Sequence, residues 1–310
     1  MNGIAAERAA RLLGSAGERE VLLGPLTTYG VGGPARLFAR VGTEADLALV
    51  HSVVAESRIP VLVVGKGSNL LVADRGFDGL AISLGGCFAE VEVDGVIVRA
   101  GGGASLPVVA RKAAAAGLAG LEWAVGVPGS VGGAVRMNAG GHGSDMAGTL
   151  VRVRVLDVSS GEDIEVPASS LGLAYRHSDV GPQQVVLRAD FELVAGERGE
   201  SEAVIAGIVS WRRENQPGGH NAGSVFTNPP GDSAGRLVEE CGLKGYRIGS
   251  AEVSSKHANF IQVDPDGSAG DVVALMALLR ARVREMTGIE LVAETKLVGF
   301  TRAELEGVTG

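Results

Sequence analysis

Three short segments of the sequence combine polar side chains in patterns that packing alone does not require. Tyr175-Arg176 places a phenol ring beside a guanidinium, and Ser224 and Asn228 present a hydroxyl and a carboxamide four residues apart, just before two prolines. Glu294 is a single carboxylate within an apolar segment. A guanidinium binds carboxylates through a planar fork, and hydroxyl and carboxyl groups can transfer protons. These residues are therefore candidates for a functional site.

Each of these residues also has a plainer interpretation. Arg176 could form a surface salt bridge, and Ser224 could stabilise a turn. Glu294 could lie on an edge strand and pair with Lys296, and for Glu294 taken alone this interpretation is favoured. The residues by themselves leave both interpretations open.

Glycine is the second source of candidate sites. The chain holds 48 glycines in 310 residues, roughly twice the usual share, and thirteen of them lie between Gly101 and Gly148. Three loops are rich in glycine and small polar residues, at 65–69, 126–133 and 138–143. Backbone N–H groups in such loops bind phosphate oxygens, and the second and third loops could instead let a flat ring lie against the backbone. A tight turn is the better explanation for any one loop. Three such loops together indicate a large cofactor that contains phosphate.

Other familiar sites are disfavoured by the pattern. The sequence has no G-x-G-x-x-G opening a helix, no P-loop motif and no G-x-S-x-G of a serine hydrolase. No histidine pair has metal-ligand spacing, and Cys87 and Cys241 lie far apart, so we expect no metal and no disulfide. The net charge of −8 argues against nucleic-acid and membrane partners.

The composition is that of a folded protein. Hydrophobic residues make up 45% of the chain and charged residues 21%, enough apolar side chains for a large core. Charges at Glu7, Arg8 and Arg11 lie where a signal peptide needs an apolar stretch. The least charged stretch, 113–135, is broken by Pro128 and glycines, unlike a membrane span. We expect a cytoplasmic protein that is a monomer or a weak oligomer.

In the first two thirds of the chain, helices and strands that could position these residues alternate. Thr43 is expected to cap a helix that ends before Pro60, and an apolar strand at 61–64 leads directly into the first glycine loop. Ser105 is expected to cap a second helix. Further strands are expected at 80–84, 91–93, 96–100, 151–158 and 185–194.

The last third has a different character. A polar stretch at 195–200 is typical of a domain linker. Helices are then expected at about 202–215, from Ser233, and at 271–288. A closing strand at 289–300 would carry Glu294 and Lys296 on one face.

Taken together, the ordered segments resemble one family closely: the UDP-N-acetylenolpyruvoylglucosamine reductases, also called UDP-N-acetylmuramate dehydrogenases, of bacterial peptidoglycan synthesis. One glycine motif would be weak support, but an ordered set along nearly the whole chain is specific. The matching stretches are 27–35 (TTYGVGGPA), 64–72 (VGKGSNLLV), 120–133 (GLEWAVGVPGSVGG), 137–140 (MNAG), Tyr175-Arg176, 223–229 (GSVFTNP) and 251–258 (AEVSSKHA).

The resemblance implies an α+β fold, with a two-part FAD-binding domain of the vanillyl-alcohol-oxidase/PCMH type and a separate α/β substrate-binding domain. We place the first FAD-binding subdomain at 1–80, the second at 81–195 and the substrate-binding domain at 196–310. The implied cofactor is non-covalent FAD, with NADPH as the reducing co-substrate. The implied substrate is UDP-N-acetylglucosamine enolpyruvate, whose enolpyruvyl ether is reduced to the lactyl ether of UDP-N-acetylmuramate.

The resemblance also implies the site residues. Arg176 would bind the substrate carboxylate, and Glu294, held protonated by burial and by that like charge, would donate to the same group. Ser224 would give a proton to the carbon that bears the ether oxygen. Further substrate contacts would be Tyr175, Asn228 and Lys244. FAD would contact Tyr29, Gly65, Gly67, Ser68, Asn69, Leu70, Gly126, Ser130, Gly132, Gly133, Asn138 and Gly140.

Two positions depart from the family pattern, and two rival functions stay open. Lys66 stands in the first loop where a small residue is common, and Thr227 stands where a basic residue is frequent. These departures leave the contacts to the UDP diphosphate of the substrate undetermined. One rival is an oxidase of the same fold, to which His142 could attach flavin covalently. The other is a non-catalytic module that binds flavin or another nucleotide.

Overall fold

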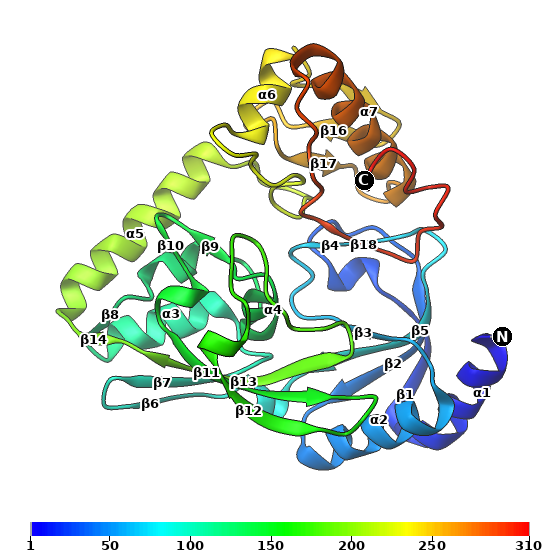
Figure 1. Cartoon of the computed structure of the whole chain (residues 1–310), viewed down its shortest axis with the longest axis vertical. Coiled ribbons are helices and arrows are strands. Elements are labelled where there is room, and N and C mark those ends of the chain that lie inside the picture. Colours follow the sequence, from blue (N-terminus) through cyan, green and yellow to red (C-terminus); the bar gives the residue numbers. More distant parts are fainter. Residues whose placement is uncertain (1, 310) are drawn as a thin grey trace. The chain divides into compact units, whose positions relative to one another are not determined.

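The computed structural model describes residues 2–309, which form two compact units (Figure 1). Both units mix helices and strands, so the predicted α+β class is confirmed. Among the described residues, no helix is long and apolar enough to cross a membrane. Unit 1 contains the residues up to Arg19, Arg36–Lys66 and Asp78–Arg212, and unit 2 contains Glu20–Ala35, Gly67–Phe77 and the residues from Arg213 onward. The three-part division expected from the sequence stays a prediction.

Two sheets account for most strands of unit 1. The first has the order β1-β2-β5-β3, formed by β1 (Gly17–Leu22), β2 (Pro34–Val41), β5 (Phe77–Leu84) and β3 (Val61–Val63). The second is antiparallel, formed in order by β12 (Asp163–Pro167), β11 (Leu150–Asp157), β13 (Gln184–Glu192), β7 (Ile97–Gly101) and β6 (Val91–Asp94). Two short antiparallel pairs are β9 (Gly140–Gly141) with β10 (Ser144–Asp145), and β8 (Leu118–Ala119) with β14 (Val194–Ala195).

The second sheet of unit 1 separates two hydrophobic cores. Val185 and Leu187 of β13 pack into one core, whereas Val186 packs into the other, as expected when successive side chains of a strand point to opposite faces. The first core also contains α1 (Asn2–Leu13) and α2 (Glu44–Ser57). The second contains residues of α3 (Leu106–Ala115), α4 (Val131–Arg136) and α5 (Arg198–Asn215).

The start of α2 confirms the predicted cap, but the start of α5 differs from expectation. The Thr43 hydroxyl accepts from the backbone N–H of Asp46 at 3.2 Å, and the Asp46 carboxylate accepts from the Thr43 N–H at 2.9 Å. Helix α5 begins at Arg198, inside the stretch expected to be a linker. Its first turn is held by a 2.7 Å hydrogen bond from Arg198 to Glu202 and by the buried Ser201 hydroxyl, which donates to Glu122 at 2.6 Å.

Unit 2 packs two helices against small sheets around one core. Helix α7 ends at Gly288, as predicted, where a φ of 73° suits glycine. The core is filled mainly by apolar residues of α7, the three-stranded sheet and the segment around Phe226. The helices are α6 (Ala234–Glu240) and α7 (Ala269–Thr287); the antiparallel sheet is β15 (Arg247–Ile248), β16 (Ala251–Val253) and β17 (Ile261–Val263); and β4 (Leu70–Val72) pairs in parallel with β18 (Lys296–Val298).

The predicted closing strand at 289–300 is wrong in length. Only Lys296–Val298 forms a strand, and Ala293 forms an isolated bridge with Phe226. The chain bends at Thr295 because it changes partner there, from the segment around Phe226 to strand β4. Glu294 therefore lies just before a bend rather than within a regular strand.

Candidate active site

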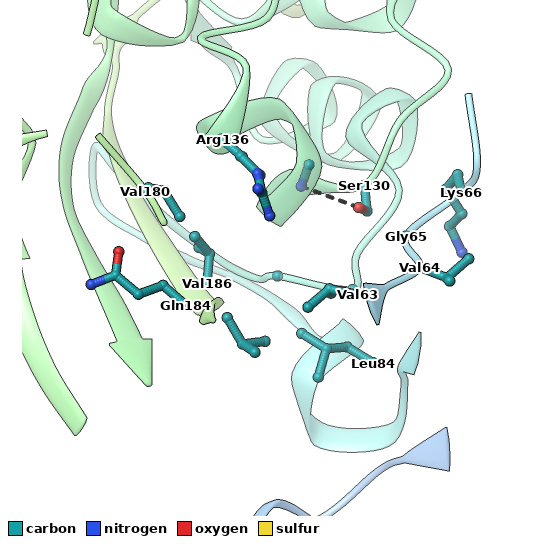
Figure 2. Close-up of a pocket in the computed structure, with 15 residues that line it drawn as sticks. Val63, Val64, Gly65, Lys66, Leu84, Ser130, Arg136, Val180, Gln184 and Val186 are labelled. Carbon is teal, nitrogen blue, oxygen red and sulfur yellow. Dashed lines mark hydrogen bonds between the residues drawn. The ribbon is translucent and has the colours of Figure 1, made fainter. Parts of the chain in front are cut away.

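A pocket in unit 1 brings together backbone from three glycine-containing segments (Figure 2). Its empty volume is about 570 Å³, including the space where the pocket opens to solvent. Four residues predicted to contact the cofactor line it: Gly65, Ser130, Gly132 and Gly133. The prediction omitted its other lining residues, among them Lys66, Gly102, Gly103 and Arg136, and an apolar wall that includes Val63, Leu84, Val180 and Val186.

Close packing explains why glycine occupies two positions in the wall of this pocket. A Cβ atom added at Gly65 would overlap the Ser130 hydroxyl, and one at Gly102 would overlap the backbone carbonyl of Val186. The Ser130 side chain in turn caps α4 by accepting from the Gly133 N–H at 3.3 Å (Figure 2). At both positions glycine is therefore required because a Cβ atom would collide with protein atoms in the wall of the pocket.

The two glycine loops at this pocket differ in their backbone donors. Among the described residues, the N–H groups of Gly65 and Lys66 have no hydrogen-bond partner. In the second loop, the Val131 N–H donates to Ala104 at 2.9 Å and the Gly132 N–H donates to Gly102 at 2.8 Å. The expectation that the 126–133 loop supplies free donors is therefore wrong for these groups, whereas the first loop fits a phosphate ligand.

The remainder of the first loop belongs to unit 2. Gly67 has a φ of 61°, and a Cβ there would overlap the Leu26 carbonyl. Ser68 follows it, and Leu70 is buried in β4. The side chain of Asn69 donates to the backbone carbonyl of Glu294 at 3.1 Å, and the Asn69 carbonyl accepts from the Lys296 N–H at 3.0 Å.

Tyr29, a predicted cofactor contact, lies in the core of unit 2. Its side chain is fully buried, and no residue among 2–309 forms a hydrogen bond with its hydroxyl. Burial raises the pKa of Tyr29, so the phenol stays protonated. The ring packs with the core around Leu71 and Phe226.

Asn138 uses its side chain to hold three segments of unit 1 together. Its Nδ2 donates to the Ala174 carbonyl at 2.9 Å and to the Asp145 carboxylate at 3.1 Å, and its Oδ1 accepts from the Ala147 N–H at 3.1 Å. Asn138 is also almost fully buried, with a φ of 37°. Its side chain therefore positions the residue that precedes Tyr175-Arg176.

The other two predicted contacts of this region pack against neighbouring side chains. Gly126 lies against the ring of His142, and Gly140 lies against Asp145. The His142 ring meets the ring of Trp211 edge-on, with 5.1 Å between centroids. Burial, and to a smaller extent Arg212, lowers the pKa of His142, so its ring is neutral at pH 7.

Tyr175 and Arg176 form the tip of a tight turn. Ala174 and His177 exchange backbone hydrogen bonds of 3.0 and 3.1 Å, and Arg176 has a φ of 56°, a conformation that costs energy for a residue with a side chain. The guanidinium carbon lies 5.3 Å from the centre of the exposed Tyr175 ring. The turn fixes the backbone from which the predicted carboxylate-binding fork extends.

The segments that carry Ser224 and Glu294 lie side by side within unit 2. The antiparallel bridge between Phe226 and Ala293 aligns their segments, and the Glu294 N–H donates to the Val225 carbonyl at 2.9 Å. A hydroxyl and a carboxyl group thus come from neighbouring backbone positions, although they are 70 residues apart in sequence.

The prediction missed Asn259, a buried residue that fixes the Ser224 segment. Its backbone carbonyl accepts from the Val225 N–H at 2.9 Å, while its side chain accepts from the Phe226 N–H at 3.1 Å and donates to the Phe226 carbonyl at 2.8 Å. A signal was present, because Asn259 directly follows the 251–258 stretch.

Asn228 and Lys244, the remaining predicted substrate contacts, are exposed and make contacts within the protein. Asn228 accepts from the Ala234 N–H at 3.1 Å, near the start of α6. Lys244 pairs with Glu239, with 2.7 Å between nitrogen and oxygen. Their roles toward a substrate stay predictions.

Comparison with known proteins gives concordant matches in both parts of the chain. Residues 35–166 match the model of a FAD binding domain, and residues 215–298 match the model described as UDP-N-acetylenolpyruvoylglucosamine reductase, C-terminal domain. The predicted FAD-binding domain is thereby confirmed.

Full-length relatives carry the same description. UDP-N-acetylenolpyruvoylglucosamine reductase of Heliobacterium modesticaldum is 45% identical, over 91% of this chain and 90% of the relative. That of Anaeromyxobacter sp. (strain Fw109-5) is 42% identical over 94% and 91%. The crystal structure of the reductase from Thermus caldophilus has a TM-score of 0.79 and 38% identity, over 90% of this chain and 98% of that one. Since such relatives match nearly end to end, this chain belongs to the UDP-N-acetylenolpyruvoylglucosamine reductase family.

Proposed function

We propose that this protein is a FAD-containing oxidoreductase that reduces the enolpyruvyl ether of UDP-N-acetylglucosamine to the lactyl ether, forming UDP-N-acetylmuramate for peptidoglycan synthesis. NADPH is the reductant, FAD is bound without a covalent link, and the enzyme works in the cytoplasm as a monomer or weak oligomer. The observation that carries the proposal is the 45% identity to a reductase of this description over 91% of the chain. The hydrogen bond from the Glu294 N–H to the carbonyl of Val225, the residue after Ser224, supports it independently.

The pocket of unit 1 fits a flavin cofactor. Gly65 and Lys66 offer unused backbone donors, and Ser130 offers a hydroxyl. When bound, FAD supplies the transfer of hydride from NADPH to the substrate. The protein must supply the binding, the orientation and the proton.

Ser224 holds the proton for the substrate carbon. As hydride adds to the terminal carbon of the enolpyruvyl group, negative charge develops on the neighbouring carbon and on the carboxylate. The Ser224 hydroxyl donates its proton to that neighbouring carbon, which bears the ether oxygen. The hydrogen bonds that Asn259 makes to Val225 and Phe226 keep the adjacent backbone in one position.

Arg176 and Glu294 stabilise the carboxylate while charge develops. The Arg176 fork donates two N–H groups to its oxygens. Glu294, in its protonated form, donates a further hydrogen bond, whereas in its ionised form it would repel the substrate. Asn138 acts through Arg176 by holding the Ala174 carbonyl at the base of the turn.

The function is tested by separating the two half-reactions under anaerobic conditions. NADPH is expected to bleach the flavin, and UDP-N-acetylglucosamine enolpyruvate is expected to restore its colour. Ser224→Ala should leave the first step intact and slow the second by about 100-fold or more. The control is Ser170→Ala, which removes an exposed hydroxyl from unit 1.

The results distinguish the rivals. Flavin that stays with acid-precipitated protein would indicate a covalent link and favour an oxidase. Reduction by NADPH without reoxidation by the enolpyruvyl substrate would overturn the proposed function. Equal loss of both half-reactions in Ser224→Ala would contradict the role of Ser224 as proton donor.

A further inference from the structure

Arg136 is a cation inside the pocket of unit 1 with no role in the predicted site. It is the last residue of α4, and its side chain extends into the pocket beside Ser130 (Figure 2). The side chain is only half-buried, but burial lowers the pKa of Arg136. The positive charge is thus partly removed from water.

The guanidinium of Arg136 has no partner among residues 2–309. No carboxylate lies within ion-pair distance of it, and no hydrogen bond from its nitrogens is formed with the described residues. By contrast, Arg154 of the same unit is paired with two carboxylates, since it contacts Glu44 and Asp163, each at 2.6 Å. A cation that is withdrawn from water without a partner is costly, so the pocket favours a negatively charged ligand.

The second glycine loop increases the need for such a cation. Its N–H groups at Val131 and Gly132 are already used within the protein. These two N–H groups are therefore not available to an anion, whereas the guanidinium of Arg136 is. Lys66 also lines the pocket, but it is exposed, so water and salt screen its charge.

The anion that fits is a diphosphate carried by an apolar group. The same pocket is lined by Arg136, by Gly65 and Lys66 with their unused N–H groups, and by an apolar wall that includes Val63 and Val186. A guanidinium binds phosphate oxygens in a bidentate manner, and an apolar wall accommodates a flat ring.

We propose that Arg136 binds the diphosphate of the flavin cofactor and is the main side-chain contact for its charge. The inference rests on the proposed function only in taking FAD as the cofactor. Because an unpaired cation is costly, Arg136 also makes the protein without FAD less stable than an apolar residue would. Arg136 thus lowers the free energy of unfolding of the apoprotein and stabilises the protein that has FAD bound.

The test compares apoprotein of the wild type with Arg136→Met, which keeps an unbranched stem and loses the charge. We expect the dissociation constant for FAD, measured by flavin fluorescence, to rise by about 10- to 100-fold. The melting temperature of the variant apoprotein should equal or exceed that of the wild type, while its increase on adding FAD should be smaller. Arg136→Lys, which keeps charge without the fork, should give an intermediate affinity.

Arg111→Met is the matched control, since Arg111 is an exposed arginine of unit 1 on α3. It should change neither the affinity for FAD nor its salt dependence, whereas Arg136→Met should make the affinity less sensitive to salt. A merely structural role for Arg136 predicts the opposite sign in the apoprotein, with a lower melting temperature.

Two simpler probes locate the contact. Arg136→Met should weaken binding of ADP and leave binding of adenosine unchanged. Equal weakening of both would indicate stacking on adenine and overturn the diphosphate assignment, as would unchanged affinity for FAD in a wild-type-like fold. Wild-type apoprotein that fails to bind FAD would instead overturn the proposed function.

Discussion

The two glycine loops that line the pocket of unit 1 look alike in sequence but use glycine for different purposes. The first loop, at 65–69, leaves the N–H groups of Gly65 and Lys66 without partners among the described residues. The second, at 126–133, directs the N–H of Gly132 to the Gly102 carbonyl at 2.8 Å. One loop leaves two backbone donors unused among the described residues, and the other places its backbone against a strand end.

This difference shows why composition could not assign the loops. Glycine permits close approach between two parts of the protein as readily as between protein and ligand. At Gly132, an added Cβ would lie 3.2 Å from the Gly102 and Val186 carbonyls, so the neighbours are protein atoms. In the proposed binding of the diphosphate, the side chain of Arg136, four residues later, supplies the donors on this side of the pocket.

The strongest test of the packing role is Gly102→Ala, beneath the second loop. Its Cβ would overlap the carbonyl of Val186 in strand β13 of the second sheet of unit 1. Moving that carbonyl would disturb the hydrogen bonds of the sheet, which costs free energy. We expect a loss of about 2–3 kcal/mol in the free energy of unfolding, measured by urea denaturation of the apoprotein. An unchanged urea midpoint would contradict the close contact between Gly102 and the Val186 carbonyl.

The first loop is tested by Gly65→Ala, where the overlap is with the Ser130 hydroxyl. Since that atom ends a short side chain, we expect a minor change in stability but about a tenfold weaker binding of FAD, about 1.4 kcal/mol. The measurement is flavin fluorescence titration. Ser130→Ala in the same chain should restore part of the affinity; if it restores none, the Ser130 contact is not the cause.

A smaller effect is expected for Ser130→Ala alone. The serine caps α4 through the 3.3 Å hydrogen bond from Gly133, and loss of such a cap costs about 1 kcal/mol. The free energy of unfolding should fall by that amount. Affinity for FAD should fall less than in Gly65→Ala, and a larger loss of affinity would show that the hydroxyl contacts the cofactor directly.

The smallest effect is expected for Gly141→Ala, also in the glycine-rich region. Apart from Gly141 itself and its two chain neighbours, no described residue has a heavy atom within 4 Å of the added Cβ, and the backbone there is not left-handed. Stability should stay within about 0.5 kcal/mol of the wild type and FAD affinity should be unchanged. A marked loss of affinity at normal stability would extend the ligand contact beyond the pocket of unit 1.

Local signals predicted the elements that depend on local chemistry. The Thr43–Asp46 capping box and the end of α7 at Gly288 are both fixed by residues within one turn. The closing strand could not be predicted in the same way, because apolar alternation does not reveal that the segment changes partner at Thr295.

The same limit applies to the candidate site. The sequence motifs identified Ser224 and Glu294, which the structure places on neighbouring segments. They did not reveal that the Asn138 side chain forms hydrogen bonds with Ala174, Asp145 and Ala147, because each of those is a tertiary contact. Arg136 was overlooked because a single arginine after an apolar helix is unremarkable until its lack of a partner is seen.

Asn69 connects the first glycine loop to the segment that carries Glu294. It lies in the first glycine loop, yet its side chain and carbonyl hold the backbone on both sides of Thr295, at Glu294 and Lys296. Order imposed on that loop by a ligand is therefore also order imposed on Glu294. Thermodynamic linkage makes this reciprocal, so a substrate that fixes Glu294 should tighten the hold on whatever the loop binds. The affinity for the cofactor and the affinity for the substrate would then be linked by the same coupling free energy.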